Sequence, residues 1–100
     1  MKKEFLSRIE FELEHRFYYL NYPEPVSAGY WKDGNGKFVP IDSMGLDHLK
    51  ASINLLKKDR KAFAKAYAGA LNEKEVVGAL MPLLDAKIEE LAAMLKKKAS

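Results

Sequence analysis

The sequence predicts a mainly α-helical fold, a small bundle of three or four helices with one β-hairpin between the first and second helices. Three observations lead to this prediction. Apolar side chains recur at steps of three and four residues along three segments of the chain. An Asp-Gly-Asn-Gly sequence at 33–36 separates two short runs of aromatic and branched residues, as in a hairpin. The length of 100 residues suits a single domain, residues 1–100, with one core.

The first helix is predicted over residues 3–20, where an apolar stripe continues from Leu6 to Leu20. A competing interpretation is a half-buried strand at 9–14, where apolar residues alternate with glutamates. The helix is favoured because its stripe is the longer of the two patterns. Pro23 and Pro25 end the helix, since proline cannot continue one and restricts the residue before it.

The hairpin is predicted over residues 29–41. Tyr30 and Trp31 precede the glycine turn, and Phe38 and Val39 follow it. Aromatic and branched residues suit short strands, and Asp-Gly and Asn-Gly supply the positive φ of a tight turn. Because an isolated hairpin is only marginally stable in water, we expect this one to pack on a helix.

Two further helices are predicted, over residues 45–68 and 73–97. The stripe of the first of these consists of Leu46, Leu49, Ile53, Leu56, Phe63 and Tyr67. The stripe of the second consists of Val77, Leu80, Leu84, Ile88, Leu91 and Leu95. Pro82 has no N–H to donate, so this last helix is expected to be kinked or broken there, and a break would supply the fourth helix.

The composition excludes several classes of protein. Apolar residues make up 48% of the chain and charged residues 31%, as in a globular protein, and the absence of cysteine excludes disulfides and thiolate metal sites. Residues 1–8 contain no apolar run of the kind that opens a signal peptide, and no stretch is long and uncharged enough to span a membrane. We therefore expect a cytoplasmic protein with no membrane partner.

Motifs for catalysis or cofactor binding are not complete in this sequence. Glu12 and His15 have the E-x-x-H spacing of a di-iron bundle, but that site needs two copies. Asp47-His48 has no serine or cysteine at a recognisable elbow. The turn at 33–36 lacks the later ligands of a calcium loop and the spacing of a phosphate loop. The sequence therefore predicts no enzyme, no cofactor and no metal site.

A protein-interaction module is the first functional prediction. Aromatic residues crowd the region from Phe17 to Phe38, and the tyrosines there form a candidate contact patch at Tyr18, Tyr19 and Tyr22. The apolar stripe from Leu80 to Leu95 is generous for so small a core. We expect a partner that is another protein or a second copy of the chain, with a homodimer formed through the last helix.

Nucleic-acid binding is the alternative functional prediction. The net charge of +3 is uneven, since residues 1–50 carry 7 Lys/Arg and 8 Asp/Glu (−1) and residues 51–100 carry 10 and 6 (+4). Opposite the apolar stripe of the 45–68 helix lie Lys50, Lys57, Lys61 and Lys65, in a row able to follow a phosphate backbone without sequence preference. A solvated lysine face is the plainer interpretation of the same row.

One segment resembles a known group of proteins. Trp31, a turn with Gly36, then Met44, His48 and Leu49 leading into a helix are similar to a pattern in small phage and prophage proteins of unknown function. The resemblance covers residues 30–58 and implies a hairpin-to-helix unit and a phage or mobile-element origin, but no activity. Gly45 departs from the capping Thr or Ser of that pattern.

The contacts of the same segment can also be predicted from physical chemistry alone, without the resemblance. Trp31 on the hairpin is expected to lie over Met44 and Leu49 and to hold the hairpin on the helix. His48 is expected to hydrogen-bond back to a carbonyl of the hairpin.

Overall fold

The computed structural model describes residues 3–20 and 29–99, and this part of the chain holds three α-helices and one antiparallel hairpin. The elements in chain order are α1 (Lys3–His15), the 3-10 turn η1 (Tyr18–Leu20), β1 (Tyr30–Lys32), β2 (Phe38–Pro40), the 3-10 turn η2 (Ile41–Ser43), α2 (Leu46–Tyr67) and α3 (Glu73–Ala99). The predicted class, mainly helical with a hairpin between the first and second helices, is confirmed.

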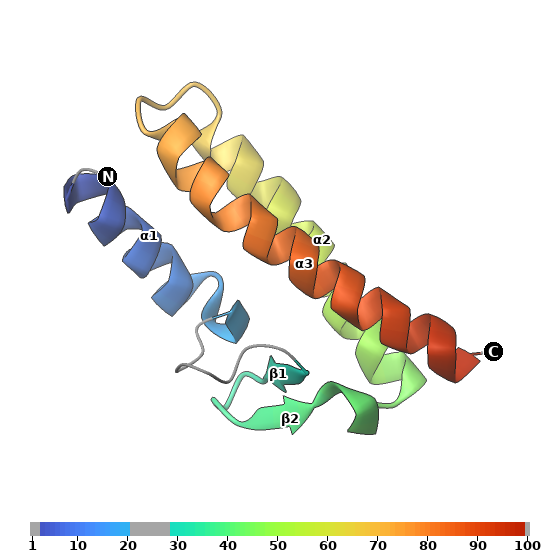
Figure 1. The fold of residues 1–100 in the computed structure, drawn as a ribbon. Coiled ribbons are helices and arrows are strands. Elements are labelled where there is room, and N and C mark those ends of the chain that lie inside the picture. The colour runs from blue at the N-terminus through green and yellow to red at the C-terminus, as the bar shows by residue number, and fades with distance from the viewer. Residues whose placement is uncertain (1–2, 21–28, 100) are drawn as a thin grey trace.

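The antiparallel pair α2 and α3 forms the long axis of the molecule (Figure 1). α1 lies beside the N-terminal half of α3, and the hairpin lies toward the other end of the pair. Within the described residues, no helix combines the length and the apolar character that crossing a membrane requires.

The first helix is shorter than predicted, because α1 ends at His15 and not at residue 20. The N–H groups of Arg16 and Phe17 both donate to the carbonyl of Glu12, which closes the helix, and Tyr18–Leu20 continue as η1. Phe17 and Tyr19 are both fully buried. Residues two apart do not share a face of an α-helix, so ending the helix lets both rings enter the core.

α3 is continuous through Pro82. Of the two alternatives that the sequence left open, a kink or a break, the break is wrong, and so is the four-helix version of the fold that it would produce. Gly78 and Pro82 both lie on the exposed side of α3. The Gly78 carbonyl, which loses its intrahelical donor to the proline, therefore has access to water. The stripe through Leu80 and Leu84 is buried on both sides of the proline, and its packing on α2 offsets the missing hydrogen bond.

Aromatic residues make up much of the core. Trp31 stacks on Tyr19 with ring centroids 5.0 Å apart and an interplanar angle of 15°, and Phe17 meets Phe63 of α2 edge to face at 5.0 Å. Met44 and Leu49 are 1% and 0% exposed and belong to the same cluster. Trp31 thus anchors the hairpin in the core, as expected, and its stacking partner is Tyr19.

The hairpin turn follows from the sequence of residues 33–37. Trp31 pairs with Val39 in the antiparallel register, and the Asp33 carboxylate accepts hydrogen bonds from the N–H groups of Asn35 and Lys37, both at 2.9 Å. Gly36 has a φ of +80°, which a residue with a side chain rarely adopts. His48 is exposed and makes no hydrogen bond with other residues of the described ranges, so the predicted bond to the hairpin is wrong.

Replacing Trp31 by alanine removes the ring that stacks on Tyr19 and leaves a cavity in the core. We expect Trp31→Ala to lower the free energy of unfolding by about 3–5 kcal/mol, and Trp31→Phe to lower it by less, because a ring remains. Urea unfolding followed by circular dichroism measures both values. An unchanged midpoint in the alanine variant would contradict the burial of Trp31.

Two glycines in exposed positions are expected to respond in opposite directions to the same substitution. Gly78 lies inside α3 with open space around the position of a Cβ, so Gly78→Ala should stabilise the protein by about 0.5–1 kcal/mol. Gly69 follows α2 with a φ of +79°, so Gly69→Ala should destabilise it by about 1–2 kcal/mol. Urea midpoints test the pair, and a shift of the same sign in both variants contradicts this description.

Candidate functional site

The exposed face of α2 carries a row of lysines opposite the core. Lys50, Lys57, Lys61 and Lys65 are all exposed, and Asn54 occupies the remaining turn of the same face. At a rise of about 1.5 Å per residue, the row extends for about 22 Å. None of these four lysines forms an ion pair with another residue of the described ranges. We call these four residues the lysine row.

Two cations outside the lysine row, by contrast, form ion pairs between or within helices. Arg60 of α2 binds Asp85 of α3 with Nε and Oδ1 2.8 Å apart, and the buried Lys87 binds Glu90 at 2.5 Å. α2 contains six Lys or Arg and two Asp, or +4. One of those acids, Asp59, accepts a hydrogen bond from the Tyr19 hydroxyl at 2.5 Å. The positive charge of the row is therefore largely uncompensated by α2 itself.

A hydrogen bond joins the last turn of α3 to the segment before α2. The Lys98 ammonium donates to the carbonyl of Met44, just before α2 begins. This bond fixes the end of α3 against the start of α2.

A polar network attaches α1 to α2 and explains the orientation of Glu12. The Tyr67 hydroxyl donates to Glu12 Oε2 at 2.8 Å and accepts from Arg8 Nε at 2.5 Å. Glu12 is 2% exposed, and Arg16 Nε lies 3.4 Å from its other oxygen. His15, the second residue of the E-x-x-H spacing, is exposed, and its Nδ1 lies 2.9 Å from the carbonyl oxygen of Phe11, so it is not part of this network. Glu12 therefore contributes to α1–α2 packing and does not share a site with His15.

Two buried tyrosines of this region are held in the protonated form. Burial, followed by the hydrogen bond to Glu12, raises the pKa of Tyr67 above its ordinary 10.0, and the hydrogen bond from Arg8 opposes that shift. Burial, followed by the hydrogen bond to Asp59, raises the pKa of Tyr19. Both hydroxyls therefore act as hydrogen-bond donors at neutral pH, and this geometry gives them a structural role.

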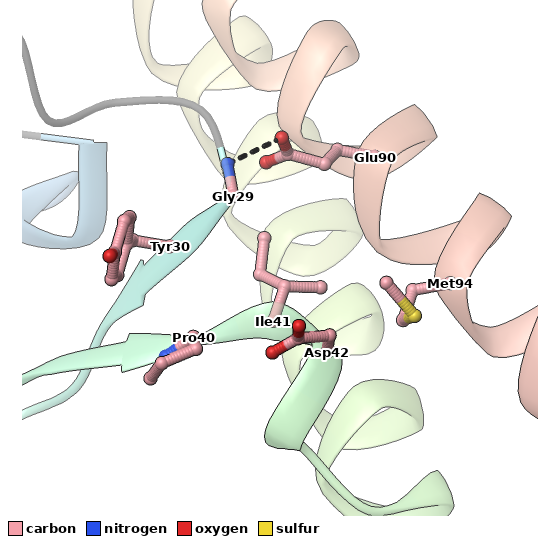
Figure 2. Close-up of a pocket in the computed structure, with 7 residues that line it drawn as sticks. All are labelled: Gly29, Tyr30, Pro40, Ile41, Asp42, Glu90 and Met94. Atoms are coloured by element: carbon pink, nitrogen blue, oxygen red, sulfur yellow. Dashed lines mark hydrogen bonds between the residues drawn. The ribbon is translucent and has the colours of Figure 1, made fainter.

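A pocket of about 300 Å³ lies between the hairpin and α3 (Figure 2). Ile41 and Met94 face each other across it, and Glu90 lies at one side. Both oxygens of Glu90 accept hydrogen bonds, Oε2 from the Gly29 N–H at 2.8 Å and Oε1 from Lys87 at 2.5 Å. The Lys87 ammonium also donates to the Tyr30 carbonyl at 3.0 Å. These groups attach the hairpin to α3, so we assign this corner of the pocket a structural role.

The two described tyrosines of the predicted protein-contact patch do not form an exposed patch. Tyr19 is fully buried. Tyr18 is half-buried, with the centre of its ring 5.1 Å from the centre of the Tyr19 ring, and Tyr22 lies outside the described residues. Tyr19 was therefore wrongly predicted as a contact residue. Leu80, Leu84 and Leu91 are each 0% exposed, so the stripe that suggested a dimer through the last helix is used in the core.

Sequence reasoning missed an exposed cluster on α1. Phe11 and His15 stack on each other, and the Arg8 guanidinium lies over the Phe11 ring. The spacing of 3 and 4 residues between them was visible in the sequence, but the competing strand pattern at 9–14 placed Phe11 among the apolar positions. We call these three residues the α1 stack.

Comparison of the chain with protein-family models, with curated proteins and with solved structures finds no match in any of the three. The resemblance of residues 30–58 to small phage and prophage proteins therefore stays a prediction. The function has to be inferred from the geometry described above.

The raised pKa of Tyr19 predicts a loss of stability at alkaline pH. The folded state keeps a phenol proton that the unfolded chain releases above pH 10.0, so the stabilisation is complete below that pH and is lost as the pH rises above it. We expect Tyr19→Phe to make the decline of unfolding free energy above pH 10 shallower by about 1.4 kcal/mol per pH unit. Urea titrations at several alkaline pH values measure the slope, and equal slopes in both proteins would contradict the prediction.

Proposed function

We propose that the protein binds nucleic acid without sequence preference, through the lysine row of α2. The observation that supports this proposal is the combination of exposure, regular spacing and missing counter-charges in the row. Phosphates of one strand follow each other about every 3.4 Å along a duplex, so a row of about 22 Å spans about six of them. A cytoplasmic location, where nucleic acid is accessible, is part of the proposal.

The chemistry of the row favours contact with the backbone over reading of bases. Lysine ammonium groups act as point charges on phosphates, whereas sequence is read mainly by Arg, Asn and Gln at base edges. The face of α2 that carries the row has one such residue, Asn54, and Arg60 is engaged with Asp85. The proposed binding is therefore governed by electrostatics and depends on salt.

The same observations argue against the protein-interaction module as the first choice. Two features of the sequence suggested such a module, the tyrosine patch and the leucine stripe. In the structure, however, Tyr19, Leu80 and Leu84 are buried in the core. The lysine row is used by no other element of the described chain, which leaves it available for a polyanion.

The test replaces the lysine row by glutamine and measures affinity for a short DNA duplex over a series of salt concentrations by fluorescence anisotropy. Removing four phosphate contacts should reduce the slope of log K against log salt by about three to four. The fold should be unaffected, because the four side chains are exposed and α2 keeps its apolar face.

A matched control carries the same change in charge elsewhere. The control substitutes glutamine at four other exposed lysines, Lys3, Lys37, Lys74 and Lys96. Both variants change the formal net charge from +3 to −1, so only the position of the charges differs. The control should retain most of the salt dependence. Equal losses in the two variants, or no binding by the native sequence at low salt, would refute the proposal.

A further inference from the structure

The α1 stack is an exposed, pre-formed column of planar groups. The rings of Phe11 and His15 are 4.2 Å apart at 23°, and Arg8 Cζ lies 4.9 Å from the centre of the Phe11 ring. Nδ1 of His15 lies 2.9 Å from the carbonyl oxygen of Phe11, in position to donate to it, which fixes the orientation of the imidazole. Phe11 remains 44% exposed and His15 is also exposed. Phe11 is thus held between Arg8 and His15, and the exposed imidazole of His15 forms the end of the column.

The α1 stack lies at the same level along the molecule as the C-terminal half of the lysine row. Three contacts set the direction of this segment: Arg8 with Tyr67, Phe17 with Phe63, and Tyr19 with Asp59. The residue numbers rise along the N-terminal segment while those of its partners fall along α2. The N-terminal segment therefore runs antiparallel to α2, with Phe11 and His15 at the level of the turns that carry Lys61 and Lys65.

Short side chains cover the surface of α2 between the side that contacts α1 and the lysine row. On α2, the positions between the side that contacts α1 and the side of Lys65 are occupied by Ala62 and Ala66, both of which are exposed. Alanine has no long side chain to separate the two features. Glu10 and Glu14 lie about 160° around α1 from Glu12, the residue that faces α2, and Glu14 neighbours Phe11 on the helix surface.

We propose that this surface binds single-stranded nucleic acid, with bases stacking on the α1 stack while the backbone lies along Lys61 and Lys65. The inference rests on the proposed function and names its substrate class. Aromatic rings beside a positively charged groove or row are the arrangement with which proteins hold single strands, because every unpaired base has a free π-face. A duplex keeps its base faces inside the helix, so it can use the row but not the stack.

The experiment compares labelled oligothymidylate with a duplex of equal length, for the native protein and for the double variant Phe11→Leu, His15→Gln. The variant removes both rings of the stack and keeps an apolar and a polar side chain of suitable size for a helix. We expect its affinity for oligothymidylate to fall about tenfold or more, with an unchanged salt slope and unchanged duplex affinity. Oligouridylate, measured in parallel, should show the same loss.

Leu6→Ala provides the matched control, since Leu6 is an exposed apolar residue of the same helix with 47% exposure. It should leave the affinity for oligothymidylate unchanged. Circular dichroism checks that α1 remains folded in both variants.

The outcomes separate the two proposals. If the native protein binds duplex and single strand equally, or if the double variant binds oligothymidylate like the native protein, the stacking inference is overturned while the role of the lysine row stands. If the native protein binds neither nucleic acid, both proposals fail.

A second measurement does not depend on the stability of a variant. The chain has two histidines, and a base stacked on the α1 stack should shift the ring protons of His15 upfield on addition of oligothymidylate. His48, which lies in the first turns of α2, is the internal reference. Equal shifts in both histidines would speak against stacking at α1.

Discussion

Tyr19 holds three separate parts of the chain in one arrangement. Its ring stacks on Trp31 of β1, its hydroxyl donates to Asp59 of α2, and it belongs to the turn that ends the first helical segment. A buried aromatic ring contributes a large apolar area, and the hydrogen bond satisfies its one polar atom. Because these contacts come from distant segments, the position of α1 and that of the hairpin both depend on this one side chain.

The Glu12 network supplies a polar complement to that aromatic core. Taking a carboxylate out of water is costly unless donors replace the water, and Tyr67 and Arg16 do so here. The Arg16 guanidinium lies 5.9 Å from the centre of the Phe63 ring, where the π-face provides further stabilisation, although its Nη1 is buried without a hydrogen-bond partner in the described chain. A purely apolar contact would allow α1 to slide along α2, whereas these directional bonds fix its register.

The parts of the fold that repeat a simple period could be predicted from the sequence. The helix expected over 45–68 is observed at Leu46–Tyr67, and the hairpin expected over 29–41 has strands Tyr30–Lys32 and Phe38–Pro40. The end of α1 could not be predicted, because it depends on the burial of Phe17 and Tyr19 against α2, a contact between distant residues. The sequence left open whether Pro82 kinks or breaks the last helix, since its continuity depends on which side of the helix meets water.

The candidate site was predictable only in part, for a related reason. A row of like charges at helical spacing is visible in one dimension, so Lys50 to Lys65 could be named from the sequence alone. Whether each lysine has a counter-ion depends on the neighbouring elements, as the pairing of Arg60 with Asp85 shows. The prediction of Tyr19 as a contact residue was wrong for the same reason. Only the packed structure shows that this aromatic residue near a turn of the chain is buried in the core.

The two opposite faces of α2 have different roles, one in the core and one at the surface. Leu49, Leu56 and Phe63 build the core on one side, and the lysine row occupies the other without contributing to packing. Substitutions on the outer face therefore encounter few structural constraints, and the charge of that face can drift or be selected while the fold is retained. A chain of this size would then be able to acquire, adjust or lose a partner through surface changes alone, with its folding information kept on the inner face of the same helix.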